Sequence, residues 1–310
     1  MLTSCLFLVL CAAGAAPSPT PAQELPTYFI RVIQDRTLFA IDEPAMITIR
    51  LGNQVESAVK SKKFPNILES IHVFRGDERL PLDPRYNSKA LYKKVPSIGY
   101  GAHKDFRLNL RKYFPETSKG GIFRILYKDD KYEVSGKTIS ILNIPLPDLK
   151  MDYLVKTSMG EFTMRLDAVQ TPSHTRNFAL LVATQFYREM LFHRVEHNYV
   201  IQTGDPMGDG TGGSGFNVTV EKSPFLRHKK YAVGMARKNE LDSADSQFYI
   251  CLEEIKALDD TYTVFGKVIS GFDVVDAIGQ VPTSPPNASL PARPLEDVHL
   301  MSIVAVPAQK

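Results

Sequence analysis

The stretch LFHRVEHNYVIQTGDPMGDGTGGSGF, residues 191–216, is the most informative segment of the chain. It gathers many polar side chains into a short run that is rich in strand-forming residues, and it then becomes glycine-rich. Three kinds of site would use such a segment: a metal centre, a phosphate-binding loop, or an arginine held beside aromatic and apolar side chains. Each kind requires particular residues at particular spacings, so the sequence itself can be tested against all three.

A metal centre would have to use His193 and His197. Their spacing suits one face of a helix, but Val195, Tyr199 and Val200 give the run strand character. On a strand, four residues place the two imidazoles about 13 Å apart. The zinc-protease pattern H-E-x-x-H is also absent. We therefore expect no metal site in this segment.

The glycine run, residues 208–213, does not fit a phosphate loop of the P-loop type, because the lysine of that motif is missing. The glycines are better explained by turns with positive φ or by close packing. No G-x-S-x-G nucleophile motif occurs, and Cys251 lies in an apolar run with no base beside it. We expect Cys251 to be a small buried hydrophobic residue. What remains is an arginine in a strand, with an aromatic residue and a glutamine a few positions later.

The composition sets wider limits. The chain has 310 residues, 44% of them hydrophobic, which is enough for two globular domains. A formal net charge of +3, spread along the chain, gives no reason to expect a nucleic-acid partner.

Residues 1–22 differ in kind from the rest. An apolar run at residues 6–10 is followed by small residues at 11–16 and by a proline-rich stretch at 17–22. We interpret this order as a signal peptide and linker, which predicts an exported protein, periplasmic or extracellular. The alternative is a buried apolar strand. The run is too short to span a membrane, so we expect no integral membrane span after cleavage of the signal.

Residues 23–148 are predicted to form a β-sandwich domain. Short runs of strand-forming residues alternate with turn signals and are not separated by amphipathic helices, which favours an antiparallel sandwich. The pattern is similar to an immunoglobulin-like domain, and no catalytic motif gives this region a role. Two prolines within residues 145–148 mark the boundary to the next domain. The expected strands cover residues 28–33, 45–51, 71–74, 106–110, 122–127 and 139–142.

Residues 149–310 have a different pattern. Met159-Gly160 lies between two strand-like runs and predicts a hairpin. Thr171-Pro172 predicts the start of a helix, with Thr171 as its cap and an apolar stripe at Phe178, Leu181 and Val182. A second helix is expected at residues 272–278. Two helices among about eight strands favour a closed barrel with helices over its ends.

This half of the chain closely resembles the cyclophilins, a family of peptidyl-prolyl cis-trans isomerases. The resemblance extends from about residue 151 to residue 306 and rests on several ordered motifs. The matching segments are Phe192–Val195, Tyr199–Asp205, Gly210–Gly213, Thr175–Phe178, Leu226–His228, Val233–Arg237, Asp245–Ile250, Leu258–Asp259 and Val264–Val268.

The resemblance implies an eight-stranded antiparallel barrel capped by two helices, and an activity that needs no cofactor. Rotation about an X–Pro bond crosses a barrier of roughly 18–20 kcal/mol through a twisted state in which amide resonance is lost. A permanently charged donor near the proline nitrogen stabilises that state more than the planar one. Arg194 matches the catalytic arginine of the family, and Gln202 matches the glutamine that supports it.

The other matching positions are expected to bind substrate. Several differ from the residues that are common in the family: tyrosine replaces phenylalanine at positions 199 and 249, valine replaces methionine at 200, arginine replaces asparagine at 237, and tyrosine replaces histidine at 262. We expect the residues at 199, 200, 249 and 262 to keep the pocket aromatic or apolar. The expected substrate-binding set is Tyr199, Val200, Ala236, Arg237, Gln247, Tyr249, Leu258 and Tyr262.

Two functions of different class follow from these matches. The first is an exported isomerase that accelerates X–Pro rotation while secreted or envelope proteins fold. The second is a cyclophilin-fold module that binds proline-containing segments without significant turnover. Both imply a proline-containing polypeptide as the partner. The presence of Arg194 together with Gln202 favours the first.

Overall fold

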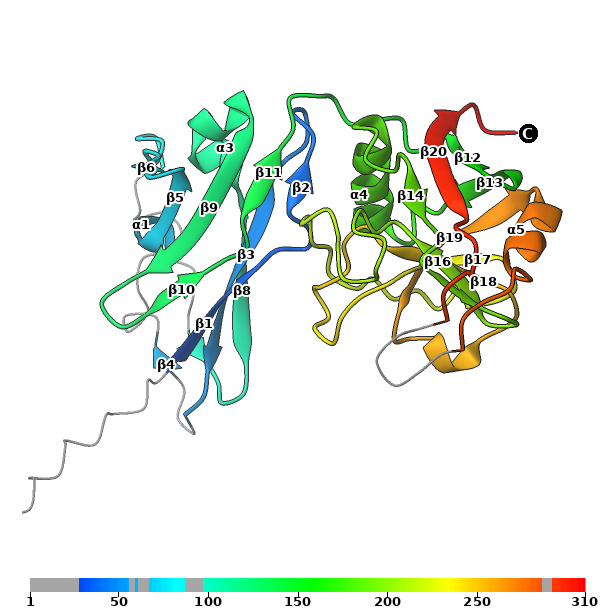
Figure 1. Cartoon of the computed structure of the whole chain (residues 1–310). Coiled ribbons are helices and arrows are strands. Elements are labelled where there is room, and N and C mark those ends of the chain that lie inside the picture. The colour runs from blue at the N-terminus through cyan, green and yellow to red at the C-terminus, as the bar shows by residue number, and fades with distance from the viewer. Residues whose placement is uncertain (1–27, 56–58, 61–66, 87–96, 286–291, 310) are drawn as a thin grey trace, which may run out of the picture.

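The computed structural model describes residues 28–55, 59–60, 67–86, 97–285 and 292–309. The predicted signal peptide and proline-rich linker lie outside these residues. Within them, two large hydrophobic clusters form, one built mainly from residues 28–141 and the other mainly from residues 153–303. The two parts lie side by side, and helix α4 (Pro172–Ala183) of the C-terminal part lies next to β2 (Leu38–Phe39) of the N-terminal part (Figure 1).

The N-terminal part consists of two main sheets. One sheet is antiparallel, with the strand order β1-β3-β8. The other has the order β2-β11-β9-β5-β6, with β10 paired to β9 and a parallel pairing between β11 and β2. A separate pair joins β4 to β7. The strands span Tyr28–Ile33 (β1), Leu38–Phe39 (β2), Met46–Asn53 (β3), Val59–Lys60 (β4), Ile71–Arg75 (β5), Glu78–Arg79 (β6), Ser97–Ile98 (β7), His103–Asn109 (β8), Gly121–Lys128 (β9), Glu133–Ser135 (β10) and Ile139–Ile141 (β11).

The two main sheets share one core, which confirms the predicted sandwich. Ile47 and Ile49 of β3, Val73 of β5 and Ile125 of β9 are all buried in the same hydrophobic cluster. The alternation of apolar and polar residues in β3 produces this arrangement, because successive side chains of a strand point to opposite faces.

The prediction was wrong about one strand end and about the absence of helices. Leu110 was expected to end a strand, but it begins the one-turn helix α3 (Leu110–Tyr113). The side chain of Asn109 accepts a hydrogen bond from the backbone N–H of Arg111, so it caps α3 and stops the strand. Two further short helices are present, α1 (Ile67–Ser70) and the 3-10 helix η2 (Pro115–Lys119).

The C-terminal part is one antiparallel sheet with the strand order β14-β20-β12-β13-β19-β17-β18-β16-β15. Strands β14 and β15 occupy the two ends of this order, yet only two residues separate them in the chain. One continuous segment therefore pairs with both ends of the sheet and closes it. Counted as one strand, β14 and β15 give the expected eight-stranded barrel. The bounds are Asp152–Thr157 (β12), Gly160–Leu166 (β13), Met190–Leu191 (β14), Arg194–Glu196 (β15), Val200–Thr203 (β16), Ala232–Met235 (β17), Phe248–Cys251 (β18), Thr263–Ser270 (β19) and His299–Val306 (β20).

The predicted hairpin and both predicted helices of this part are present. The hairpin joins β12 to β13, and the helices are α4 and α5 (Phe272–Ile278). A short 3-10 helix, η3 (Lys256–Leu258), lies in the loop between β18 and β19. The side chain of Thr171, however, does not cap α4, because it donates to the carbonyl of Asp167. The carboxylate of Glu221 accepts from the first-turn amides of Ser173 and His174 instead.

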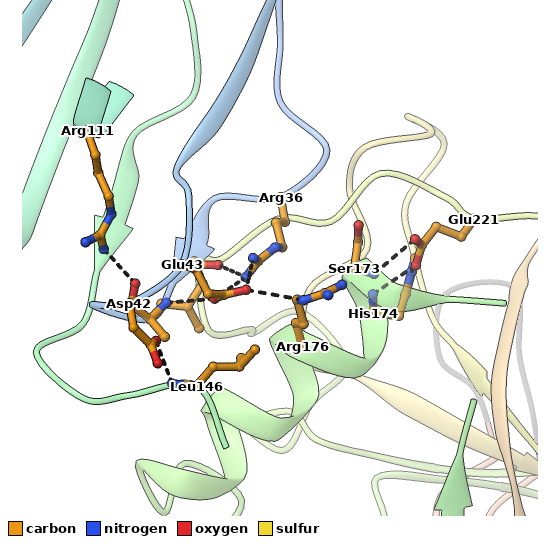
Figure 2. Close-up of polar contacts among 11 residues, drawn as sticks. Arg36, Asp42, Glu43, Arg111, Leu146, Ser173, His174, Arg176 and Glu221 are labelled. Carbon is orange, nitrogen blue, oxygen red and sulfur yellow. Dashed lines mark hydrogen bonds and ion pairs between the residues drawn. The ribbon is translucent and has the colours of Figure 1, made fainter. Parts of the chain in front are cut away.

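The two parts meet through the segment that contains β2. Leu38 and Ala40 belong to the N-terminal half of the chain, yet they are buried in the hydrophobic cluster of the barrel. Close by, the carboxylate of Glu43 pairs with Arg36 and with Arg176 of α4 (Figure 2). Segments far apart in sequence thus share both an apolar core and a buried charge cluster.

Candidate active site

Strand register brings the expected catalytic residues into one row. Arg194 of β15 lies opposite Gln202 of β16, Gln202 lies opposite Tyr249 of β18, and Tyr249 lies opposite Gly234 of β17. Residues directly opposite each other in neighbouring strands point to the same face of a sheet. The row therefore gathers on one face residues that are separated by up to 55 positions in the chain.

That face is the outer face of the barrel. Ile201 and Ile250, the neighbours of Gln202 and Tyr249, are buried in the large barrel cluster. Val200, Tyr249 and Cys251 instead belong to a separate small cluster. Burial raises the pKa of the Cys251 thiol to about 12, which makes it the inert hydrophobic residue that was predicted.

Arg194 is held from two sides and remains partly accessible. Its Nε donates to Glu196 Oε1 at 2.9 Å, and its Nη1 donates to Gln202 Oε1 at 3.1 Å. The guanidinium also lies 5.7 Å from the ring centroid of Tyr199. With its side chain 29% exposed, Arg194 is oriented by the protein but can still donate to a bound molecule.

Gln202 connects the arginine to the glycine-rich loop. Its Nε2 donates to Gln247 Oε1 at 2.8 Å, and Gln247 Nε2 donates to the carbonyls of Gly210 and Gly212 at 3.0 and 2.8 Å. This chain of bonds fixes which end of each amide faces which partner. Gln202 is thus bonded to Arg194 on one side and to Gln247 on the other.

Two carboxylates shape the glycine-rich loop. Asp205 accepts from the amides of Met207, Asp209 and Gly210. Asp245 accepts from the amides of Ser214 and Gly215, both at 2.8 Å. Gly210, with φ of +91°, adopts a backbone conformation that favours glycine. The loop is therefore a fixed wall beside the site.

A pocket of about 200 Å³ opens beside Arg194. Nine of the ten expected site residues line it, and the tenth, Gln247, lines the adjoining cavity. The wall is aromatic and apolar, as a proline ring requires. The nine residues are Arg194, Tyr199, Val200, Gln202, Ala236, Arg237, Tyr249, Leu258 and Tyr262.

A hydrogen-bonded relay lies beneath this pocket. The hydroxyl of Tyr249 lies 2.9 Å from His228 Nε2, and His228 Nδ1 lies 2.8 Å from Asp259 Oδ1. A carboxylate can only accept, so Nδ1 carries the proton and Nε2 accepts from the phenol. Burial lowers the pKa of His228, against the opposing effect of Asp259. The relay thus joins Tyr249 to the loop that carries Leu258.

Gly234 makes room for the tyrosine of this relay. A Cβ atom at Gly234 would overlap the phenol ring of Tyr249, which lies opposite it in the sheet. The rim of the pocket is closed by Arg237, whose guanidinium lies 4.7 Å from the ring centroid of Tyr262. The Arg237 side chain also donates to the carbonyl of Thr261 at 3.0 Å. The amide of Ala236 donates to the carbonyl of Gln247, so that N–H is already used.

The resemblance to the family included Asp205, Asp245, His228 and Asp259 in its matching segments but gave them no supporting role, and it did not include Glu196. Their roles depend on pairings across the fold, although the spacing of Arg194 and Glu196, with one residue between them, places both on one strand face. The two histidines considered as metal ligands have different surroundings. His193 is buried, and His197 Nε2 lies 2.9 Å from the carbonyl of Val281. Among the described residues, no group of three metal-ligating side chains is found.

Several known proteins are similar to the C-terminal half of this chain. The family model for cyclophilin-type peptidyl-prolyl cis-trans isomerases matches residues 153–304. Peptidyl-prolyl cis-trans isomerase-like 1 of Aspergillus fumigatus is 36% identical over 153 residues, which cover 48% of this chain and 92% of that protein. Peptidyl-prolyl cis-trans isomerase-like 3 of Gallus gallus is 35% identical over 156 residues, covering 49% and 94%. A cyclophilin-type isomerase of Cryptosporidium parvum aligns in structure with a TM-score of 0.47 and 26% identity, covering 51% and 99%.

The chain therefore belongs to the cyclophilin-type peptidyl-prolyl cis-trans isomerases. The relatives are matched over nearly their whole length, and the match lies in the C-terminal half of this chain. The enzyme class is thus an isomerase of X–Pro bonds.

Proposed function

We propose that Arg194 and Gln202 catalyse X–Pro isomerisation in the pocket beside them. The observation that carries this proposal is the position of Arg194: a charged, partly exposed guanidinium held by Gln202 and Glu196 at the edge of an aromatic pocket. The proline ring binds among Tyr199, Val200 and Leu258. Arg194 then donates toward the proline nitrogen as it becomes pyramidal in the twisted state, which stabilises that state over the planar ones.

The remaining pocket residues orient the peptide. Tyr249 and Tyr262 provide the aromatic wall, with their ring centroids 6.3 Å apart in an edge-to-face arrangement. Ala236, Arg237 and Gln247 lie where the peptide main chain would pass from the pocket into the adjoining cavity. No proton transfer, metal or covalent intermediate enters this mechanism, because bond rotation itself requires none.

The test compares wild type with Arg194→Ala in an NMR exchange or protease-coupled assay on an X–Pro peptide. Removing one donor that acts in the transition state is expected to lower kcat/KM about 100-fold. Arg107→Ala is a matched control, because Arg107 is an exposed arginine of β8 in the N-terminal part. Equal rates for wild type and Arg194→Ala would refute the role of Arg194. Peptide binding without turnover in wild type would favour the binding-module function instead.

We further propose that the protein is exported, periplasmic or extracellular, and that it assists folding of secreted or envelope proteins. The support is the order of residues 6–16, an apolar run followed by small residues. No helix among the described residues is long and apolar enough to cross a membrane. Fractionation of producing cells, with N-terminal sequencing of the mature chain, tests this proposal. An uncleaved N-terminus on a protein retained in the cytoplasm would overturn it.

We also propose that residues 23–148 and 149–310 are two domains, each with a main core of its own, and that Leu38 and Ala40 of the first pack into the core of the second. The two large hydrophobic clusters support this division. Limited proteolysis tests it: stable fragments that end near residue 148 are expected, and cleavage spread evenly through both parts would contradict the division.

A further inference from the structure

A second cavity adjoins the proline pocket. It measures about 360 Å³ and shares Gln202, Ala236 and Arg237 with the proline pocket. Its far wall is formed by the glycine-rich loop and by Asn217, Ser243 and other residues of two segments, 215–219 and 238–245. A peptide whose proline occupies the first pocket would place a flanking residue in this second cavity.

The first of these wall segments is bonded directly to the N-terminal part. The amide of Thr37 donates to the carbonyl of Asn217 at 3.0 Å, and the amide of Asn217 donates to Thr37 Oγ1 at 2.9 Å. The amide of Thr219 donates to the carbonyl of Asp35 at 2.8 Å, and Thr219 Oγ1 donates to the carbonyl of Gln34 at 3.1 Å. Residues 34–37 therefore pair with 217–219 in the manner of an added strand.

The second wall segment is held behind the first. The amide of Val218 donates to the carbonyl of Ala244 at 2.7 Å, and the amide of Val220 donates to the carbonyl of Leu241 at 2.7 Å. Lys137 reaches this segment from the N-terminal part: its ammonium lies 2.9 Å from Asp242 Oδ2 and also donates to the backbone carbonyl of Asp242. Both segments that close the second cavity are thus tied to the N-terminal part.

The residues of the N-terminal part that contact the wall segments are themselves held in place by hydrogen bonds and by packing. Gln34 bonds the backbone of Lys137 at its amide and at its carbonyl, both at 2.7 Å, so Lys137 is held in the same sandwich edge as residues 34–37. Behind this edge, Leu38 is buried in the barrel core, and Glu43 pairs with Arg36 and Arg176 (Figure 2). The wall segments therefore rest on a fixed support.

We propose that Thr37 and Lys137 are positioning residues of the isomerase, which hold the wall of the second cavity so that it binds the peptide residues flanking the proline. The proposal rests on the proposed function of the first pocket. The N-terminal sandwich thereby takes part in peptide recognition by the isomerase, because it supports the wall that the residues flanking the proline contact.

The experiment measures the benefit of substrate length. The benefit is defined as kcat/KM for a peptide extended by three residues on both sides of the proline, divided by kcat/KM for a capped X–Pro dipeptide. Kd values for the same two peptides, measured by NMR titration, provide a second ratio that does not depend on turnover. Both ratios use the full chain.

Two pairs of variants distinguish the loss of one interaction from the effect of changing the side chain. Thr37→Val removes the hydroxyl that Asn217 uses, whereas Thr37→Ser retains it. Lys137→Met removes the charge that pairs with Asp242, whereas Lys137→Arg retains it. Lys128→Met is the control, because Lys128 makes an ion pair of 2.7 Å with Glu133 at another edge of the sandwich.

Thr37→Val and Lys137→Met are each expected to lower the length benefit about fivefold, the equivalent of one lost hydrogen bond, while Thr37→Ser, Lys137→Arg and Lys128→Met retain it. Amide hydrogen exchange in residues 238–245 should rise in Lys137→Met and not in Lys128→Met. Wild-type ratios in both disruptive variants, or no length benefit in wild type, would overturn the proposal. If wild type binds both peptides without turnover, the proposed function fails, and the ratio of Kd values still decides whether Thr37 and Lys137 position the wall.

Discussion

Two arginine–glutamate clusters of this molecule use the same groups in opposite ways. Arg36 at the junction is 9% exposed and is bonded to both oxygens of Glu43 and to the carbonyl of Leu38. The Arg194 side chain at the candidate active site is 29% exposed and donates hydrogen bonds to Glu196 Oε1 and Gln202 Oε1. The first guanidinium is enclosed by its partners, whereas the second keeps a side open to the pocket.

The difference shows what distinguishes a structural arginine from a catalytic one. Burial lowers the pKa of Arg36, and the charge and hydrogen bonds of Glu43 oppose that effect. A buried ion pair contributes through the high cost of leaving one partner alone. A partly exposed pair such as Arg194–Glu196 contributes little to stability, but it orients a donor that can act on a ligand.

The strongest test of this comparison is Glu43→Ala. It leaves Arg36 buried without its carboxylate, so we expect the free energy of unfolding to fall by about 3–5 kcal/mol. Urea denaturation followed by far-ultraviolet circular dichroism measures the change. Glu133→Ala is the matched control, since Glu133 pairs with Lys128 on the exposed surface and should cost about 1 kcal/mol or less. A loss of the same small size for Glu43→Ala would show that the junction cluster is not structural.

The second test removes the charge that orients Arg194. Glu196→Gln keeps the shape of the side chain but weakens the hold on Arg194 Nε, so kcat/KM is expected to fall about threefold to tenfold. Steady-state isomerase assays measure this effect, with Glu161→Gln as a control, because Glu161 pairs with Lys156 away from the pocket. A rise in kcat/KM would mean that the carboxylate competes with the substrate for Arg194.

The third test asks whether Arg194 matters for stability. Arg194→Ala is expected to change the free energy of unfolding by less than about 1 kcal/mol, because its ion pair with Glu196 is partly exposed. The same denaturation experiment reports the value. A loss as large as that of Glu43→Ala would place the two clusters in the same class and remove the distinction drawn between them.

The smallest expected effect concerns pH and the relay under the pocket. The pKa of His228 is lowered by burial, so the folded protein favours the neutral ring. Stability from this group is present above the ordinary histidine pKa of about 6.5 and is lost as the pH falls from there toward the lowered pKa of the folded state. Protonation also places a hydrogen on Nε2, where it faces the hydroxyl of Tyr249.

Because His228 of the folded protein is protonated only at its lowered pKa, we expect kcat/KM of wild type to decline as the pH falls through that lowered pKa, on the acid side of the ordinary value of about 6.5. Tyr249→Phe removes the hydroxyl, so it should lower kcat/KM about threefold near neutral pH and flatten the decline on the acid side. Assays at several pH values for both proteins check this expectation. An identical acid-side decline in Tyr249→Phe would show that the relay does not affect the pocket.

The sequence predicted many strands and helices of both parts because their signals are local. The alternation in residues 45–51, the turn at Met159-Gly160 and the proline at position 172 each act through neighbouring residues, and the structure confirms the elements they predict. The cap of α4 was predicted incorrectly. Its first amides are bonded by Glu221, 47 residues away from His174, and local preference cannot reveal such a partner.

By itself, the sequence determined the family and the residues that surround a proline pocket, because the motifs carry those residues in a recognisable order. Only the tertiary structure decided which groups support them: Glu196 beside Arg194, the His228–Asp259 pair under Tyr249, and Thr37 and Lys137 behind the second cavity. These contacts join segments whose separation in the chain reaches 180 residues. Such pairings depend on strand register and on the packing of one part of the chain against another, which no local pattern encodes.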